Sequence, residues 1–174
     1  AVLKESVAVD PKLTAAHLAL GATLIKLGRF EEAERSLRIA IKLDPTNADA
    51  HLHLGILRSE NGKFVRAEEN FRSAVNLKPD WAIALIELGK SVERQDRKED
   101  AETHYRAALR LEPEYTPGLI AYGLLEVDRG NLDHAEILIE KANSESPNTT
   151  ENEIALGDLH IARENFEESL KLFE

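Results

Sequence analysis

The chain has 174 residues, 43% of them hydrophobic and 31% charged, which is enough apolar material for the core of one domain. It contains no run of about 18 apolar residues that could span a membrane, and no cysteine, which excludes disulfide bonds and thiol chemistry. The formal net charge is -10, and the acidic surplus lies in residues 112–174, which carry 15 acidic and 4 basic side chains. Residues 1–111 carry 17 acidic and 18 basic side chains. The acidic end would repel nucleic acid, which is therefore not a predicted partner.

A spacing of 34 residues relates two sets of backbone-determining residues along the chain. The glycines are Gly21, Gly55, Gly89, Gly123 and Gly157, and the prolines are Pro11, Pro45, Pro79, Pro113 and Pro147. Proline restricts the backbone and glycine frees it, so a shared register predicts one structural unit repeated along the chain.

In the first complete unit, residues 14–47, apolar side chains recur twice at helical spacing, which predicts a helix A followed by a helix B. Gly28 lies between them and can adopt the left-handed conformation that ends helix A. Pro45 cannot continue helix B, and Thr46 or Asn47 can cap the helix A that follows.

Small residues predict how the two helices pack. Gly21 in helix A and Ala33 in helix B allow the two backbones to approach closely, and Leu37 and Ala40 are expected to pack against the neighbouring unit. A unit of this kind cannot bury its apolar face alone, so the units are expected to stack.

These features resemble the tetratricopeptide repeat, a helix-turn-helix unit of 34 residues with a small residue in helix A, an alanine and a large apolar residue in helix B, and a proline near the end. The resemblance implies an all-α fold, a right-handed superhelical solenoid. The pattern recurs as Leu54, Gly55, Ala67, Phe71, Ala74 and Pro79; as Leu88, Gly89, Ala101, Tyr105, Ala108 and Pro113; and as Tyr122, Gly123, Ala135, Ile139, Ala142 and Pro147.

The resemblance divides the chain into a single array. The segments are the second half of a preceding repeat at residues 1–13, four repeats at 14–47, 48–81, 82–115 and 116–149, and a partial fifth repeat at 150–174. Neither end shows the polar capping helix that arrays need. We therefore expect a fragment of a longer protein, or ends that are covered by another copy of the chain.

Two repeats depart from the pattern. In the third, Asp96 stands near the place of the turn glycine, and we expect the turn to persist because Asp tolerates the left-handed region. In the fourth, Pro117 and Gly118 open helix A, which is expected to begin there with a weakened first turn, and helix B is expected at about residues 133–144.

No group of residues predicts catalysis, and no cofactor or metal is expected. His17 and His51 share one position in successive repeats and are interpreted as packing residues, because a metal needs three or four convergent ligands. Neither a glycine-rich phosphate loop nor a nucleophile beside a base is present. Asn148 begins a glycosylation sequon, which matters only in a secreted eukaryotic protein.

The resemblance does predict a binding surface, because helix A lines the concave groove of the family. Carrying the groove positions over to this sequence gives Leu18, Ala22, Ile25, Leu52, Ile56, Ile86, Lys90, Glu93, Arg94, Ile120, Leu124, Val127, Ile154 and Asp158. The alternative is that several aliphatic residues of this set, above all those at the fifth position of each repeat, are buried between neighbouring A helices.

Two specialised grooves of the family do not fit. The clamp that binds a partner's terminal carboxylate uses Lys, Arg and Asn where this chain has Leu18, Ala22 and His53. The asparagine ladder of protein O-linked N-acetylglucosamine transferase would occupy a position that reads Ala19, His53, Glu87, Ala121 and Ala155.

The sequence therefore predicts a scaffold or adaptor that binds another protein, either a peptide or a helix with apolar anchors. Alternatives are the substrate-recruiting segment of a larger enzyme, such as a glycosyltransferase, and a scaffold that associates with itself through its ends. The acidic last third is either the solvated face of its helices or a docking surface for a basic partner. The compartment stays open, with the cytoplasm favoured over the periplasm.

Overall fold

The computed structural model describes residues 13–164, and every regular element in that range is an α-helix. An all-α repeat fold is thus confirmed. The helices are α2 (Thr14–Lys26), α3 (Phe30–Leu43), α4 (Ala48–Glu60), α5 (Phe64–Leu77), α6 (Ala82–Glu93), α7 (Lys98–Leu111), α8 (Thr116–Asp128), α9 (Leu132–Glu145) and α10 (Thr150–Ala162). Within this part of the chain, no helix has both the length and the apolar character needed to cross a membrane.

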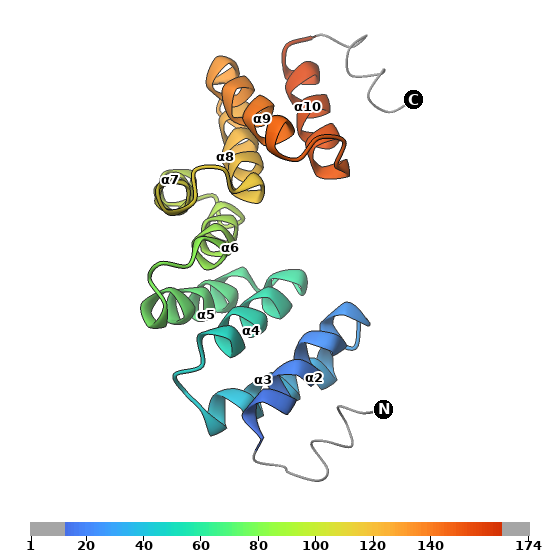
Figure 1. Cartoon of the computed structure of the whole chain (residues 1–174), viewed down its shortest axis with the longest axis vertical. Coiled ribbons are helices and arrows are strands. Elements are labelled where there is room, and N and C mark those ends of the chain that lie inside the picture. Colours follow the sequence, from blue (N-terminus) through green and yellow to red (C-terminus); the bar gives the residue numbers. More distant parts are fainter. Residues whose placement is uncertain (1–12, 165–174) are drawn as a thin grey trace.

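The helices form antiparallel pairs that stack in a curved row (Figure 1). The A helices, α2, α4, α6, α8 and α10, contact one another from each repeat to the next. Among the described residues no two B helices, α3, α5, α7 or α9, make such a contact. The A helices therefore lie on the inner, shorter side of the curve, and the B helices lie on the outer side.

In the repeats whose helix B is described, the glycine near the middle of helix A is covered by a large side chain of helix B from the same repeat. A Cβ atom added to Gly55 would lie 2.5 Å from the Phe71 ring, and one added to Gly21 would lie 2.6 Å from Cγ of Leu37. Leu37 also belongs to one buried cluster with Leu54 and Leu57 of the next repeat. The large residue of helix B thus packs within its own repeat and supports the neighbouring one.

The turns between helices A and B need one residue in the left-handed region. Gly28 has φ of +67°, and Asp96 adopts nearly the same angle, +61°, in the third repeat. The expectation that the turn persists at Asp96 is confirmed, and the backbone N–H of Asp96 donates to the Glu93 carbonyl at 2.9 Å. Asp is tolerated here because its short side chain fits the left-handed conformation better than most.

Helix ends also follow the sequence. Asn47 caps α4, since its side-chain oxygen accepts from the Ala50 backbone N–H at 2.9 Å. Helix α8 begins at Thr116 with Pro117 in its first turn, as expected, and α9 extends one residue beyond the predicted range at each end. The predictions for residues 1–12 and 165–174, which concern the half repeat, most of the last B helix and the uncapped ends, lie outside the described residues.

A row of carboxylates joins the repeats at their outer edge. Glutamate occupies one position in four successive repeats, and each glutamate meets a side chain of the repeat that follows. These pairs are Glu34 with Arg58 at 3.9 Å, Glu68 with Gln95 at 2.8 Å, Glu102 with Arg129 at 2.7 Å, and Glu136 with Arg163 at 3.1 Å. Each pair therefore links two neighbouring repeats, in addition to the apolar packing between them.

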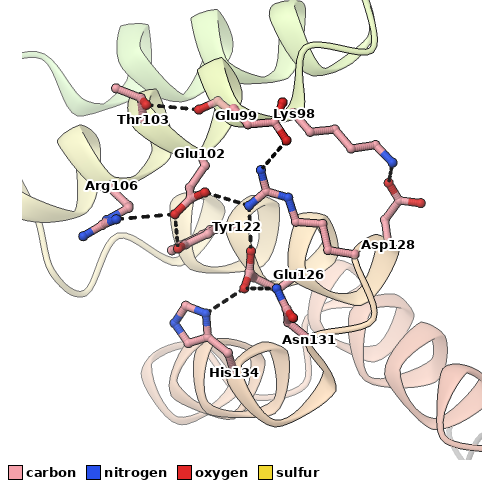
Figure 2. A network of polar contacts seen from close by, with 11 residues as sticks. Lys98, Glu99, Glu102, Thr103, Arg106, Tyr122, Glu126, Asp128, Asn131 and His134 are labelled. Carbon is pink, nitrogen blue, oxygen red and sulfur yellow. Dashed lines mark hydrogen bonds and ion pairs between the residues drawn. The ribbon is translucent and has the colours of Figure 1, made fainter.

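Figure 2 shows the third of these junctions, where α7, α8 and α9 meet. Arg129 donates to Glu102 and also to the buried Glu126, at 3.2 Å. Glu126 accepts further bonds from Asn131 at 3.1 Å and from His134 Nδ1 at 2.9 Å. The hydrogen bond from Arg129 holds the pKa of Glu102 below its usual value. Glu102 and Glu126 therefore have hydrogen-bonding partners from the protein itself.

Candidate partner-binding surface

The residues predicted to line the groove all lie on the A helices or, for Arg94, directly after α6. Their exposure differs widely. Ile154 is 47% exposed, whereas Leu52 and Ile86 are 3% and 1% exposed. Arg94 and Asp158 are exposed, and the remaining positions are half-buried: Leu18, Ala22, Ile25, Ile56, Lys90, Glu93, Ile120, Leu124 and Val127.

Leu52 and Ile86 are packed into the core that joins the central repeats. A Cβ atom added to Gly118 of α8 would lie 3.0 Å from Cδ1 of Ile86, so α8 lies directly over that side chain. Leu52 and Ile86 therefore agree with the alternative prediction, in which residues at the fifth position of a repeat are buried between neighbouring A helices. At the same repeat position, Ile154 of α10 is exposed to solvent.

One cavity on the inner side gathers three of the predicted residues, Lys90, Ile120 and Leu124. It lies between α6, α8 and α10 and has a volume of about 600 Å³. Ile120, Ala121 and Leu124 form an apolar wall on α8. The remaining lining residues are Thr116, Pro117, Ser146, Thr149 and Glu151.

The rim of this cavity consists largely of residues outside the predicted groove set. Thr116 and Pro117 open α8, and Ser146 and Thr149 belong to the connection between α9 and α10. The first residues of each helix A could have been included among the candidates, because the start of α8 and the connection before α10 come together at Thr116 and Ser146. Sequence reasoning considered only the faces of the helices.

Hydrogen bonds hold this rim in place. The hydroxyl oxygens of Thr116 and Ser146 lie 3.2 Å apart, within hydrogen-bonding distance. Asn152, which is fully buried, donates its side-chain N–H to the carbonyl of Ser146. Thr149 caps α10 by accepting from the Asn152 backbone N–H at 3.3 Å. The mouth of the cavity is therefore formed by groups that are already oriented in the absence of a partner.

The charged middle of the predicted groove is largely engaged within the protein. Lys90 Nζ lies 2.9 Å from the carboxylate of Glu87. The Tyr105 hydroxyl donates to Glu93 at 2.5 Å, and burial together with that carboxylate raises the pKa of Tyr105. Lys90 and Glu93 thus each have an intramolecular partner. Ile120 and Leu124 pack in part against the core and leave the rest of their surface to the cavity.

His17 and His51, which the sequence predicts to be packing residues, are buried and half-buried, respectively. His17 is buried in α2, and Nε2 of His51 lies 3.1 Å from the carbonyl oxygen of Pro45. Within residues 13–164, no three His, Asp or Glu side chains come together in a way that could hold a metal ion. Asn148, which begins the sequon, is exposed before α10 with φ of +58°.

Comparison with protein families agrees with this geometry. The family model described as Tetratricopeptide repeat matches residues 18–82, 54–116 and 86–148, so the matches together extend over residues 18–148. The chain belongs to the tetratricopeptide repeat family. A comparison with curated proteins finds no match.

Several solved structures share the tetratricopeptide fold. The crystal structure of MamA protein is 26% identical, with a TM-score of 0.72 over 92% of this chain and 87% of that chain. TTC0263, a thermophilic TPR protein in Thermus thermophilus, is 24% identical, with a TM-score of 0.82 over 92% and 88%. YrrB, a TPR protein with an unusual peptide-binding site, is 17% identical, with a TM-score of 0.72 over 99% and 89%.

Proposed function

We propose that this tetratricopeptide chain is a protein-interaction scaffold that binds a segment of another protein on its inner side. An apolar side chain of that segment enters the cavity between α6, α8 and α10. The observation that carries this proposal is the apolar wall of Ile120, Ala121 and Leu124 on a surface that already has a fixed rim. A volume of about 600 Å³ lies in the range of cavities that hold ligand groups.

One anchor is not sufficient for tight binding. A leucine or phenylalanine side chain that leaves water for an apolar site contributes about 2 kcal/mol, or roughly a 30-fold gain in affinity. Micromolar affinity requires about 8 kcal/mol in total, so the segment must also contact the inner face beyond the cavity. The exposed Ile154 of α10 and the half-buried Val127 of α8 are predicted groove residues, on two of the helices that line the cavity, that can supply such contacts.

We also propose that this segment has no catalytic role. The most elaborate polar cluster, around Glu102 and Glu126, resembles a candidate site in composition. Its two carboxylates accept hydrogen bonds from Arg129, Tyr122, Asn131 and His134, so they act as a junction between repeats. Glu126 and His134 also line an open hollow of about 670 Å³. We expect them to act there as structural groups, because each already has a hydrogen-bonding partner within the protein.

Leu124→Gln tests the binding proposal, because it replaces part of the apolar wall by a polar side chain. We expect proteins captured from a cell extract by the natural chain to be lost with this variant. Ile137→Gln is the matched control, since Ile137 is 65% exposed on α9 and lies outside the cavity. Captured proteins are identified by mass spectrometry, and circular dichroism verifies that each variant is folded.

Leu124 is half-buried, so a second variant keeps the test valid if Leu124→Gln unfolds. Glu151 is exposed in the first turn of α10 and lines the cavity, so Glu151→Trp covers the mouth without altering the core. It is expected to lose the same proteins. Retention of every captured protein by both cavity variants would contradict the proposal.

A further inference from the structure

A second hollow adjoins the cavity. It has a volume of about 530 Å³ and shares Thr116, Pro117 and Ser146 with the cavity. The residues that line only this second hollow belong to the connection between α7 and α8, and they are Glu112, Pro113, Glu114 and Tyr115. A single ridge, formed by the three shared residues, therefore separates an apolar hollow from one that contains two carboxylates.

The carboxylates around this ridge lack basic partners. Glu112, Glu114 and Glu151 are exposed, and none of them forms a salt bridge with another of residues 13–164. The basic side chain that lines either hollow is Lys90, and it is already paired with Glu87. The surface beside the cavity is therefore negative.

The negative charge near this ridge also affects the pKa of Tyr115. Its phenol lies in the wall of the second hollow, and burial, together with the negative charges of Glu87 and Glu112, raises its pKa. The phenol therefore stays neutral and adds no further negative charge. Its ring and Pro113 give the hollow an apolar surface along which the stem of a long basic side chain can lie.

We propose that the segment bound in the cavity is basic, with a Lys or Arg side chain that crosses the ridge and lies between Glu112 and Glu114. This inference rests on the proposed function and names the chemistry of the partner. The apolar anchor and the basic residue are close in the partner's sequence, about three or four residues apart in a helix or two in an extended strand. Exposed carboxylates without partners attract such a cation at little desolvation cost.

Charge also argues against other occupants. A second copy that docked through this same region would bring another acidic surface to the ridge, since residues 112–174 carry 15 acidic and 4 basic side chains. An acidic segment would be repelled in the same way. A basic segment is the occupant whose charge is complementary to the ridge and whose apolar side chain fits the cavity.

The test uses the whole chain and three labelled synthetic peptides of equal length and helical spacing. The first combines Leu with Lys, the second combines Leu with Glu, and the third replaces each Leu of the first by Ala. Fluorescence anisotropy measures their affinities at low and at high salt. We expect the Leu/Lys peptide to bind about tenfold more tightly than either of the others, and salt to reduce that advantage.

Variants of the chain locate the effect. Glu112→Gln with Glu114→Gln is expected to weaken the Leu/Lys peptide about fivefold, because two exposed ion pairs are lost. Glu69→Gln with Glu140→Gln is the matched control, since both residues are exposed on outer helices and the net charge changes equally. The control is expected to bind the peptide as the natural chain does.

The outcomes separate the two proposals. If the Leu/Glu peptide binds as tightly as the Leu/Lys peptide, or if the control pair weakens binding equally, the basic partner is wrong. The proposed function then still stands, provided that Leu124→Gln weakens the peptides that contain Leu. If Leu124→Gln has no effect on any peptide, the proposed function is wrong. If sedimentation shows that the natural chain self-associates and that the Glu112→Gln, Glu114→Gln variant does not, the ridge binds a second copy and the basic partner is wrong.

Discussion

The two sides of α8 use their polar groups in opposite ways. On the outer side, Arg129 donates to Glu102 of α7 and to Glu126 of α8, and Glu126 also accepts from His134 of α9 (Figure 2). On the inner side, Ile120 and Leu124 face a cavity. The carboxylates beside that cavity take part in no salt bridge with the described residues.

The difference shows which surface has capacity for a partner. A polar group that already has partners contributes to the stability of the junction and gains little from a ligand. Apolar surface that faces solvent, and carboxylates without cations, gain when a complementary segment covers them. Helix α8 therefore joins the repeats with one side, and its other side is the one that we propose for partner binding.

Residues at the same repeat position on the inner side differ in burial, and the prediction with the largest expected effect tests this difference. Ile86→Ala removes atoms from a residue that is 1% exposed, so we expect the free energy of unfolding to fall by about 3 kcal/mol. Ile154→Ala at the same repeat position should change it by less than about 0.5 kcal/mol. Urea denaturation followed by circular dichroism measures both, and equal losses would show that the fifth position is packed alike in both repeats.

Arg129→Met tests whether the outer side of α8 contributes to stability independently of partner binding on the inner side. It removes the cation from the buried Glu126 and the shorter of two ion pairs from the partly buried Glu102, which keeps Arg106 at 3.4 Å. We expect a loss of about 2 kcal/mol of stability. Arg110→Met is the control, because Arg110 is exposed and forms no salt bridge among the described residues.

Peptide binding should depend on the inner side of α8 and not on the outer side. Folded Arg129→Met is expected to bind the Leu/Lys peptide like the natural chain, whereas Leu124→Gln should lose binding with a smaller loss of stability. Anisotropy titrations under conditions where the variants are folded measure this. Weakened binding by Arg129→Met would show that the outer junction and the cavity are coupled.

The smallest expected effect concerns pH. The pKa of Glu102 is held below its ordinary value of 4.5, first by the hydrogen bond from Arg129. A depressed pKa contributes stability above the ordinary value, and that stability is lost as pH falls through the lowered pKa. Glu102→Gln should therefore reduce the acid-induced fall in melting temperature below about pH 4.5, by the equivalent of less than about 1 kcal/mol. Glu60→Gln, at an exposed position, should leave the acid-induced fall unchanged.

Particular residues show how far the sequence could lead to this structure. The spacing of Gly55 and Phe71 recurs in other repeats, so the pattern predicted a helix pair that packs closely in each unit. Asp96 was identified as a turn residue because local backbone preference decides such a turn. The rim residues Thr116 and Ser146 were missed, because they meet only when two connections from different repeats come together.

By itself, the sequence determined the helices, the turns and the stacking of repeats, because each depends on contacts between residues fewer than about 40 positions apart that recur with the period. The tertiary structure alone decided which inner residues are covered. Ile86 and Ile154 occupy the same position in the repeat, yet one lies under the next A helix and the other is exposed on the last described one. Exposure depends on the neighbour that covers a residue, and the position within a repeat does not specify that neighbour.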